Sequence, residues 1–139
     1  MEPMEINGNG LECKLQFSKP DFNGLMKTTI NIVTPSLKGG FSCTMYINEL
    51  KSFVDGLSAL NNAIGKEFGI TWGNVGENIE FTINLSKLGK LTGSYKFSPN
   101  NFSLGPTLSG DFKADRTNID SWLIQAEEIV ANASEIRAS

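Results

Sequence analysis

The sequence predicts an α+β fold with a mostly antiparallel sheet of about six to seven strands and two amphipathic helices packed on one face. Three observations lead to this prediction. Apolar and polar residues alternate in seven segments, as in half-buried strands. Two other segments carry apolar residues at helical spacing. The connections are mostly short, which favours antiparallel neighbours. The predicted order is βββαββββα.

The first half of the chain contains three of the predicted strands and one helix. The strands cover residues 11–17, 28–33 and 41–47 and are separated by turns rich in Pro, Asn and Gly. From Leu50 onward the apolar spacing becomes i, i+3, i+4, i+7, which predicts a helix. Asn48 is placed to cap this helix, and Gly65 is available to end it.

The second half contains four strands and the last helix. Strands are predicted at residues 68–72, 79–86, 90–97 and 108–115. The helix is expected to start near Thr117, with Asp120 in the carboxylate position of a capping box. Because the alternation leaves one face of the sheet polar, we expect both helices on the opposite face, where they close the core.

The length of 139 residues suits a single domain, residues 1–139, with one core. The sequence shows no internal repeat or linker that would divide it. Residues 1–10 and 133–139 are expected to fray, as chain ends commonly do.

Composition excludes several classes of function. The chain has 12 Lys and Arg against 15 Asp and Glu, a net charge of −3, which argues against a nucleic-acid backbone binder. It has no His, so it has no Ser-His-Asp triad and no imidazole zinc ligand. Two Cys without His leave at most an incomplete metal site, so neither a metal nor another cofactor is expected. Both thiols, Cys13 and Cys43, lie on apolar strand positions and are expected to be buried.

The expected location is the cytoplasm, without membrane association. The N-terminal residues lack the cationic and apolar regions of a secretory signal. No apolar run approaches the roughly 20 residues that span a bilayer.

No constellation in the sequence predicts a catalytic site, and we expect the protein not to be an enzyme. Asp111 and Asp115 share a strand face but lie roughly 13 Å apart along it, too far for a glycosidase pair. The glycine-rich stretch of residues 69–76 lacks the Gly-Lys-Ser/Thr of a phosphate loop and is interpreted as a turn.

Six exposed positions are instead candidates for binding a partner. Five lie on the polar phase of the later strands, and Tyr46 lies on the polar phase of the third predicted strand, near Glu49. A phenol beside a carboxylate can anchor a partner, although Tyr46 can equally lie over a sheet edge. The candidates are Tyr46, Glu80, Asn84, Asp111, Lys113 and Asp115.

The chain resembles a bacterial family in the arrangement of these landmarks. Gly39, Gly40 and Phe41 begin a strand that leads into Ile47-Asn48-Glu49-Leu50-Lys51-Ser52-Phe53. After several Gly-turned strands, Phe112-Lys113-Ala114-Asp115-Arg116-Thr117 opens the last helix. This order is similar to the immunity proteins of the wall-associated (WapI-like) and contact-dependent toxin systems, over about residues 39–132. Where that family is expected to read Asp-Gln-Thr followed by an aromatic residue and Leu, this chain keeps Asp115 and Thr117 but has Arg116, Asn118 and Ile119.

The resemblance implies a non-enzymatic inhibitor that binds the C-terminal domain of a secreted toxin and blocks its active site. An acidic face would favour encounter with a basic toxin domain. We expect a monomer or weak dimer. Two alternatives stay open. A small-ligand carrier would use a cavity between sheet and helices, with small residues at Ala59, Ala63 and Ala126. An enzyme would have to rely on carboxylates and Tyr alone.

Overall fold

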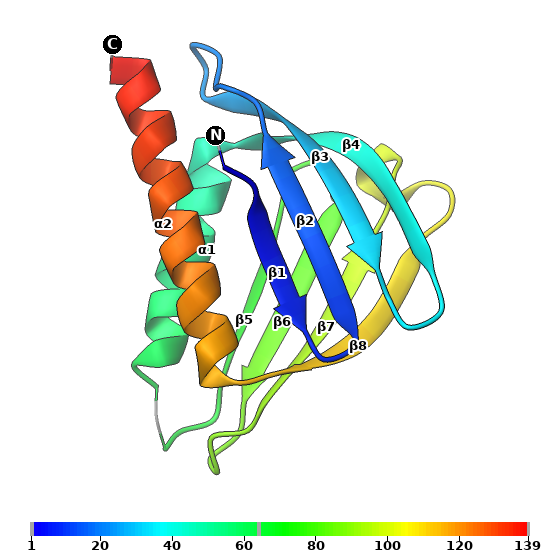
Figure 1. Cartoon of the computed structure of the whole chain (residues 1–139), viewed down its shortest axis with the longest axis vertical. Coiled ribbons are helices and arrows are strands. Elements are labelled where there is room, and N and C mark those ends of the chain that lie inside the picture. Colours follow the sequence, from blue (N-terminus) through cyan, green and yellow to red (C-terminus); the bar gives the residue numbers. More distant parts are fainter. Residues whose placement is uncertain (1, 64, 139) are drawn as a thin grey trace.

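Four antiparallel strands followed by a helix occur twice along the chain (Figure 1). The computed structural model describes residues 2–63 and 65–138, with residues 103 and 136–138 described by their backbone only. The first half comprises β1 Met4–Gly8, β2 Leu11–Phe17, β3 Leu25–Val33, β4 Lys38–Tyr46 and α1 Ile47–Asn61. The second comprises β5 Phe68–Gly73, β6 Ile79–Leu85, β7 Leu91–Phe97, the short 3-10 helix η1 Asn101–Ser103, β8 Leu108–Ala114 and α2 Arg116–Ala138.

The α+β class and the antiparallel pairing are confirmed, but the expected single sheet is wrong. The described residues form eight strands in two four-stranded sheets, ordered β1-β2-β3-β4 and β5-β6-β7-β8. In Figure 1 one sheet lies over the other, and α1 and α2 run side by side along one side of the pair. The period-two pattern reports that one face of a strand is buried, but not whether a helix or a second sheet covers it.

The strand missing from the sequence prediction is β1, in a segment expected to fray. Met4 and Ile6 are fully buried, and β1 pairs with β2 from Met4 opposite Leu15 to Gly8 opposite Leu11. Asn9 and Gly10 form the turn between them, and Gly10 has a φ of +105°, which favours glycine. The other end expected to fray is also ordered in part, since α2 continues to Ala138 and Ala133 is buried.

Both helices begin earlier than expected. The first starts at Ile47, directly after β4, so Asn48 lies inside it rather than capping it. It ends at Asn61, before Gly65. Its buried positions follow the predicted apolar spacing: Ile47, Leu50, Phe53, Leu57 and Leu60.

A row of aromatic rings connects the two helices through the second sheet. Phe53 of α1 stacks on Trp72 of β5 at 4.1 Å between ring centroids, and Trp72 lies 6.0 Å from Phe81 of β6. Phe81 meets Phe112 of β8 edge to face at 6.4 Å, and Phe112 meets Trp122 of α2 at 6.0 Å. These contacts make one continuous core of the helices and the sheet.

Among the described residues, hydrogen bonds join the two sheets at two places. Asn9 and Lys113 exchange backbone hydrogen bonds of 2.8 and 2.9 Å, which connect the end of β1 to β8. The Asn74 amide, in the turn between β5 and β6, donates a 3.0 Å hydrogen bond to the Thr44 carbonyl of β4. These links hold the second sheet in place relative to the first. In the part of the chain that is described, no helix has the length and apolar character needed to cross a membrane.

Candidate functional site

The outer face of the second sheet carries most of the predicted partner-binding residues. Strand pairing sets Glu80 opposite Lys96, Thr82 opposite Ser94 and Asn84 opposite Thr92 between β6 and β7. Between β7 and β8 it sets Ser109, Asp111 and Lys113 opposite Lys96, Ser94 and Thr92. We call these nine residues the polar face: Glu80, Thr82, Asn84, Thr92, Ser94, Lys96, Ser109, Asp111 and Lys113. The sheet therefore brings together Glu80, Asn84, Asp111 and Lys113, as expected.

The charges of the polar face are balanced, which the sequence did not indicate. Its two carboxylates, Glu80 and Asp111, are accompanied by two ammonium groups, Lys96 and Lys113. Glu80 and Lys96 are direct cross-strand neighbours, a pairing of opposite charges that stabilises a sheet. The face is therefore polar rather than acidic, and it has no built-in preference for a cationic surface.

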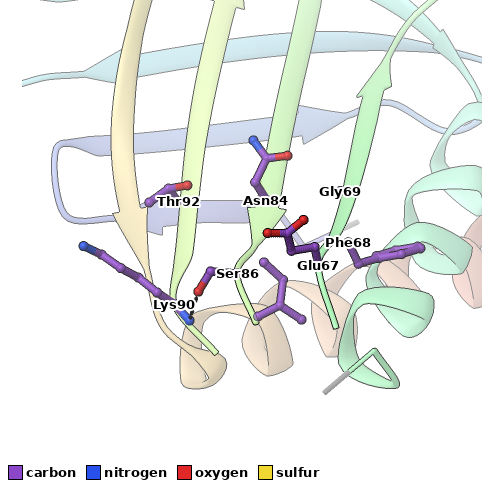
Figure 2. A pocket seen from close by; sticks show the side chains of 8 residues that line it. Glu67, Phe68, Gly69, Asn84, Ser86, Lys90 and Thr92 are labelled. Atoms are coloured by element: carbon purple, nitrogen blue, oxygen red, sulfur yellow. Dashed lines mark hydrogen bonds between the residues drawn. The ribbon is translucent and has the colours of Figure 1, made fainter. Parts of the chain in front are cut away.

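One end of the polar face is hollowed into an open pocket of about 480 Å³ (Figure 2). Figure 2 shows Asn84 and Thr92 on neighbouring strands, with Lys90 and Ser86 on one side of the pocket and Phe68 on the other. The Lys90 N–H donates a 3.0 Å hydrogen bond to the Ser86 hydroxyl, which closes the turn at this end.

A second hollow lies at the other end of the polar face. It has a volume of about 390 Å³ and includes Glu80, Ser94, Lys96, Ser109 and Asp111. Thr82 and its cross-strand partner Ser94 lie in the middle of the polar face; Thr82 lines neither hollow, whereas Ser94 lines the second. Because these central side chains are short, the face stays shallow and open in its middle, where the backbone of the sheet is close to the surface.

Asp115 does not belong to the polar face. It follows β8 and directly precedes α2, and its carboxylate accepts a 2.9 Å hydrogen bond from the Asn118 N–H. The Asn118 side-chain oxygen in turn accepts a 2.9 Å hydrogen bond from the Asp115 N–H. Asp115 is thus the cap of α2, and the expected cap formed by Thr117 and Asp120 is wrong.

Tyr46 lies apart from the other candidates, on the outer face of the first sheet. It is the last residue of β4, pairs with Leu25 of β3, and is 40% exposed. The neighbouring Glu49 carboxylate accepts hydrogen bonds from the backbone N–H groups of Tyr46 (3.0 Å) and Val75 (2.7 Å). This carboxylate therefore holds the turn between β5 and β6 against the start of α1.

The acidic surplus of the protein lies on the helices. Among the exposed residues whose side chains are described, α1 and α2 carry more carboxylates than cations. The cations are Lys51 and Arg116, and the carboxylates are Asp55, Asp120, Glu127, Glu128 and Glu135. The negative potential that the charge balance predicts is thus displaced from the sheet toward the helical side.

The space that a carrier would use beneath the helices is filled. Phe53, Leu57 and Ala126 are fully buried, whereas Ala59 is exposed and faces away from the core. The gap beside Leu60 and Ile119 holds only about 10 Å³, at most the room for one water molecule. Ala63 is half-buried and packs against the core.

The thiols are shielded from reaction. Burial raises the pKa of Cys13 to about 12. Burial, followed by the nearby Glu49 carboxylate, raises the pKa of Cys43 to about 12. Cys13 is buried as expected, while Cys43 is only half-buried. Both are free, and no group of three or more Cys, Asp or Glu in the described chain is arranged to hold a metal ion.

One apolar pocket was not anticipated from the sequence. It has a volume of about 330 Å³ and lies between the β3–β4 hairpin and the connection from β7 to β8. Leu37 in that hairpin lines the pocket and is 57% exposed, and Leu104 in the same connection is 67% exposed but lies outside the lining. The sequence did carry a signal for this pocket. Apolar residues stand here in segments otherwise made of Pro, Gly and polar residues, and turns of this kind do not normally bury apolar side chains.

No protein-family model matches the chain, and no curated protein matches it in sequence.

Proposed function

We propose that this chain is a cytoplasmic, non-catalytic immunity protein that binds the C-terminal domain of a secreted or contact-dependent toxin and blocks its active site. The proposed contact surface is the polar face of the second sheet. The observation that carries the proposal is the convergence of Glu80, Asn84, Asp111 and Lys113 on this one preformed surface.

Three properties of the polar face suit a protein partner. It is built on β6, β7 and β8, whose backbones are held by continuous pairing, so little ordering is required on binding. Its hollows of about 480 and 390 Å³ are open and can accept protruding side chains of a partner. Its charges of both signs stand at defined register positions on paired strands, which favours specificity and register more than raw affinity.

The charge distribution refines the expected mechanism. The carboxylates of α1 and α2 provide the long-range attraction toward a basic toxin domain. The balanced polar face then makes the specific contacts. Under this proposal, salt weakens the association rate more strongly than the lifetime of the complex.

The carrier alternative has less support, because the space beneath the helices is filled by core residues.

The test is an affinity pull-down of the tagged chain from its native host, with the proteins of neighbouring reading frames co-expressed, followed by native mass spectrometry. We expect a stoichiometric complex with a toxin domain, and loss of toxin activity in the complex. Recovery of the chain with a small molecule bound and no protein partner would contradict the proposal.

A pair of matched variants locates the interface. Ser94→Arg places a long cation in the middle of the polar face and should weaken the complex on the order of 100-fold, or ~2.8 kcal/mol. Thr29→Arg makes the same kind of change on the outer face of the first sheet, where Thr29 is exposed between Gln16 and Ser42. This control should bind like the unmodified protein. Equal weakening by both variants would show that the polar face is not the contact surface.

A further inference from the structure

Strand β4 is an edge strand of the first sheet, and no strand in the described part of the chain pairs with its other side. The Ile47 N–H bonds to the Gly24 carbonyl on the β3 side, whereas the Thr44 carbonyl turns away from β3 and accepts a bond from Asn74. Along an antiparallel strand, the N–H and C=O groups of alternate residues point to the same side. Gly40 and Ser42 alternate with Thr44, so their N–H and C=O groups also point away from β3. No hydrogen bond from another described residue reaches these outward groups.

The unanticipated apolar pocket adjoins this free edge. Phe41 of β4 and Leu108 of β8 line it, together with Phe97 and Pro106. The rings of Phe41 and Phe97 pack edge to face, with 6.4 Å between their centroids. This contact forms the inner end of the pocket. Lys38 is the only charged residue among the described residues that line it.

The pocket owes part of its volume to Gly39. This residue faces inward opposite Ile32, and a Cβ atom built on it would meet nothing within 4 Å. At the next position, by contrast, a Cβ on Gly40 would collide with the Ile30 carbonyl at 2.8 Å. Of these two glycines, Gly39 is the one that leaves open space, and it does so on the side of the strand that faces the pocket.

We propose that the free edge of β4 binds an extended segment of another protein by strand addition, with an apolar side chain of that segment in the pocket and a carboxylate beside Lys38. Each part of the site selects one property of the occupant. The backbone groups of Gly40 and Ser42 require an extended backbone. The pocket selects an apolar side chain, and Lys38 selects an acidic neighbour.

A second copy of this chain suits the edge less well. Strand β4 contains Lys38 but neither Asp nor Glu, so a second copy of β4 paired along this edge would supply no carboxylate for Lys38. The bond between Asn74 and Thr44 also limits the free edge to the part of β4 before Thr44. A short acidic and apolar segment of a different protein fits both restrictions. The free edge belongs to the first sheet and no residue of the polar face lines the pocket, so the site does not depend on the polar face or on the proposed function.

The test uses the full chain and a displayed library of random nonapeptides, followed by fluorescence anisotropy with the enriched peptides. We expect enriched sequences with apolar residues at alternate positions and one Asp or Glu. Gly39→Leu fills the pocket, and Ser42→Pro removes an outward N–H without removing a bond to β3. Each should weaken peptide binding at least about tenfold.

The matched controls are Gly39→Ala, which adds one methyl group to open space, and Ser42→Thr, which keeps the N–H. Both should bind within about threefold of the unmodified chain. A peptide N-methylated at alternate residues tests the backbone pairing without any change to the protein, and it should lose binding. Thermal unfolding of each variant establishes that the fold is retained.

Absence of enriched peptides, or equal binding by Gly39→Leu and the unmodified chain, overturns the proposal. Sedimentation provides another such result. If the unmodified chain self-associates with rising concentration and Ser42→Pro abolishes this, the edge binds a second copy and the proposal is overturned. Loss of binding in Ser94→Arg but not in Gly39→Leu would place the peptide on the polar face and likewise overturn it.

Discussion

Asp115 and Asn118 exchange two hydrogen bonds of 2.9 Å across the first turn of α2, each side chain accepting from the other's backbone N–H. This reciprocal pair satisfies one N–H at the helix start and fixes the direction in which the chain leaves β8. A residue that the sequence placed on a binding face is thus needed to begin the helix.

Replacement of Asp115 should therefore lower thermal stability rather than partner affinity. Asp115→Ala removes the acceptor and should lower the melting temperature at pH 7, while Asp115→Asn keeps an acceptor and should lower it less. Circular dichroism melting measures both. A toxin complex weakened by Asp115→Asn at unchanged melting temperature would contradict the assignment of Asp115 as a cap.

The pairing of Asp115 with Asn118 also predicts that folding stability depends on pH. The hydrogen bond from the Asn118 N–H, followed by that from the Thr117 hydroxyl, lowers the pKa of Asp115. The stability contributed by ionised Asp115 is therefore fully present above its unfolded pKa of about 3.9 and is lost as pH falls through the lower folded pKa. The melting difference between the unmodified chain and Asp115→Asn should shrink from pH 5 to pH 2. A difference that stays constant over this range argues against the coupling.

The contribution of Glu49 to folding stability should have the opposite pH dependence. Burial raises its pKa, although the N–H groups of Tyr46 and Val75 act against this. Because the folded pKa lies above the unfolded value of about 4.3, ionisation of Glu49 costs stability as pH rises through that window. Relative to Glu49→Gln, the unmodified chain should be more stable at pH 4 than at pH 7. Denaturant unfolding at both pH values measures this, and a reversed order contradicts it.

Glu49→Ala tests the clamp on the turn between β5 and β6. It leaves the N–H groups of Tyr46 and Val75 without their carboxylate acceptor and should cost about 1 kcal/mol of unfolding free energy. Hydrogen exchange should show faster exchange at Val75, while exchange in β2 keeps its normal protection. Unchanged exchange at Val75 would show that the bond does not hold the turn.

Two glycines of the second sheet should respond differently to the same substitution. A Cβ on Gly93 would enter the ring of buried Phe112, whereas a Cβ on Gly110 would meet the hydroxyl end of Tyr95. Phe112 is held between Phe81 and Trp122, so Gly93→Ala overpacks the core and should cost about 1–3 kcal/mol. Gly110→Ala should cost less, because Tyr95 is more exposed than Phe112, at 7% against 3%, and its hydroxyl is the terminal atom of the side chain. Urea unfolding of the two variants decides the order.

The cysteines should react slowly in the folded protein. With pKa values of about 12, Cys13 and Cys43 form very little thiolate at pH 8. Ellman's reagent should label neither thiol rapidly until denaturant is added, and the half-buried Cys43 should react before Cys13. Rapid labelling of Cys13 in the native state would show that β2 opens readily.

The local signals in the chain were sufficient for most of the elements. The alternation of Leu11, Cys13, Leu15 and Phe17 predicted β2 with its observed bounds, and all four residues are buried. The polar phase of β6 and β8 correctly placed Glu80 and Asp111 on a common exposed face, because residues two apart on a strand share a side. The turn of Asn9 and Gly10 was also readable, and it would have revealed β1.

Other features were decided only by tertiary structure. Alternation tells that a strand has one buried face, but the pairing of eight strands into two sheets depends on which neighbours bury that face. The separation of Tyr46 from the polar face follows from that division. Cross-strand register set Lys96 beside Glu80 and so neutralised a face that composition suggested to be acidic. The pocket beside Gly39 exists because two distant loops meet there, and hydrophobic periodicity carries no information about contacts between loops.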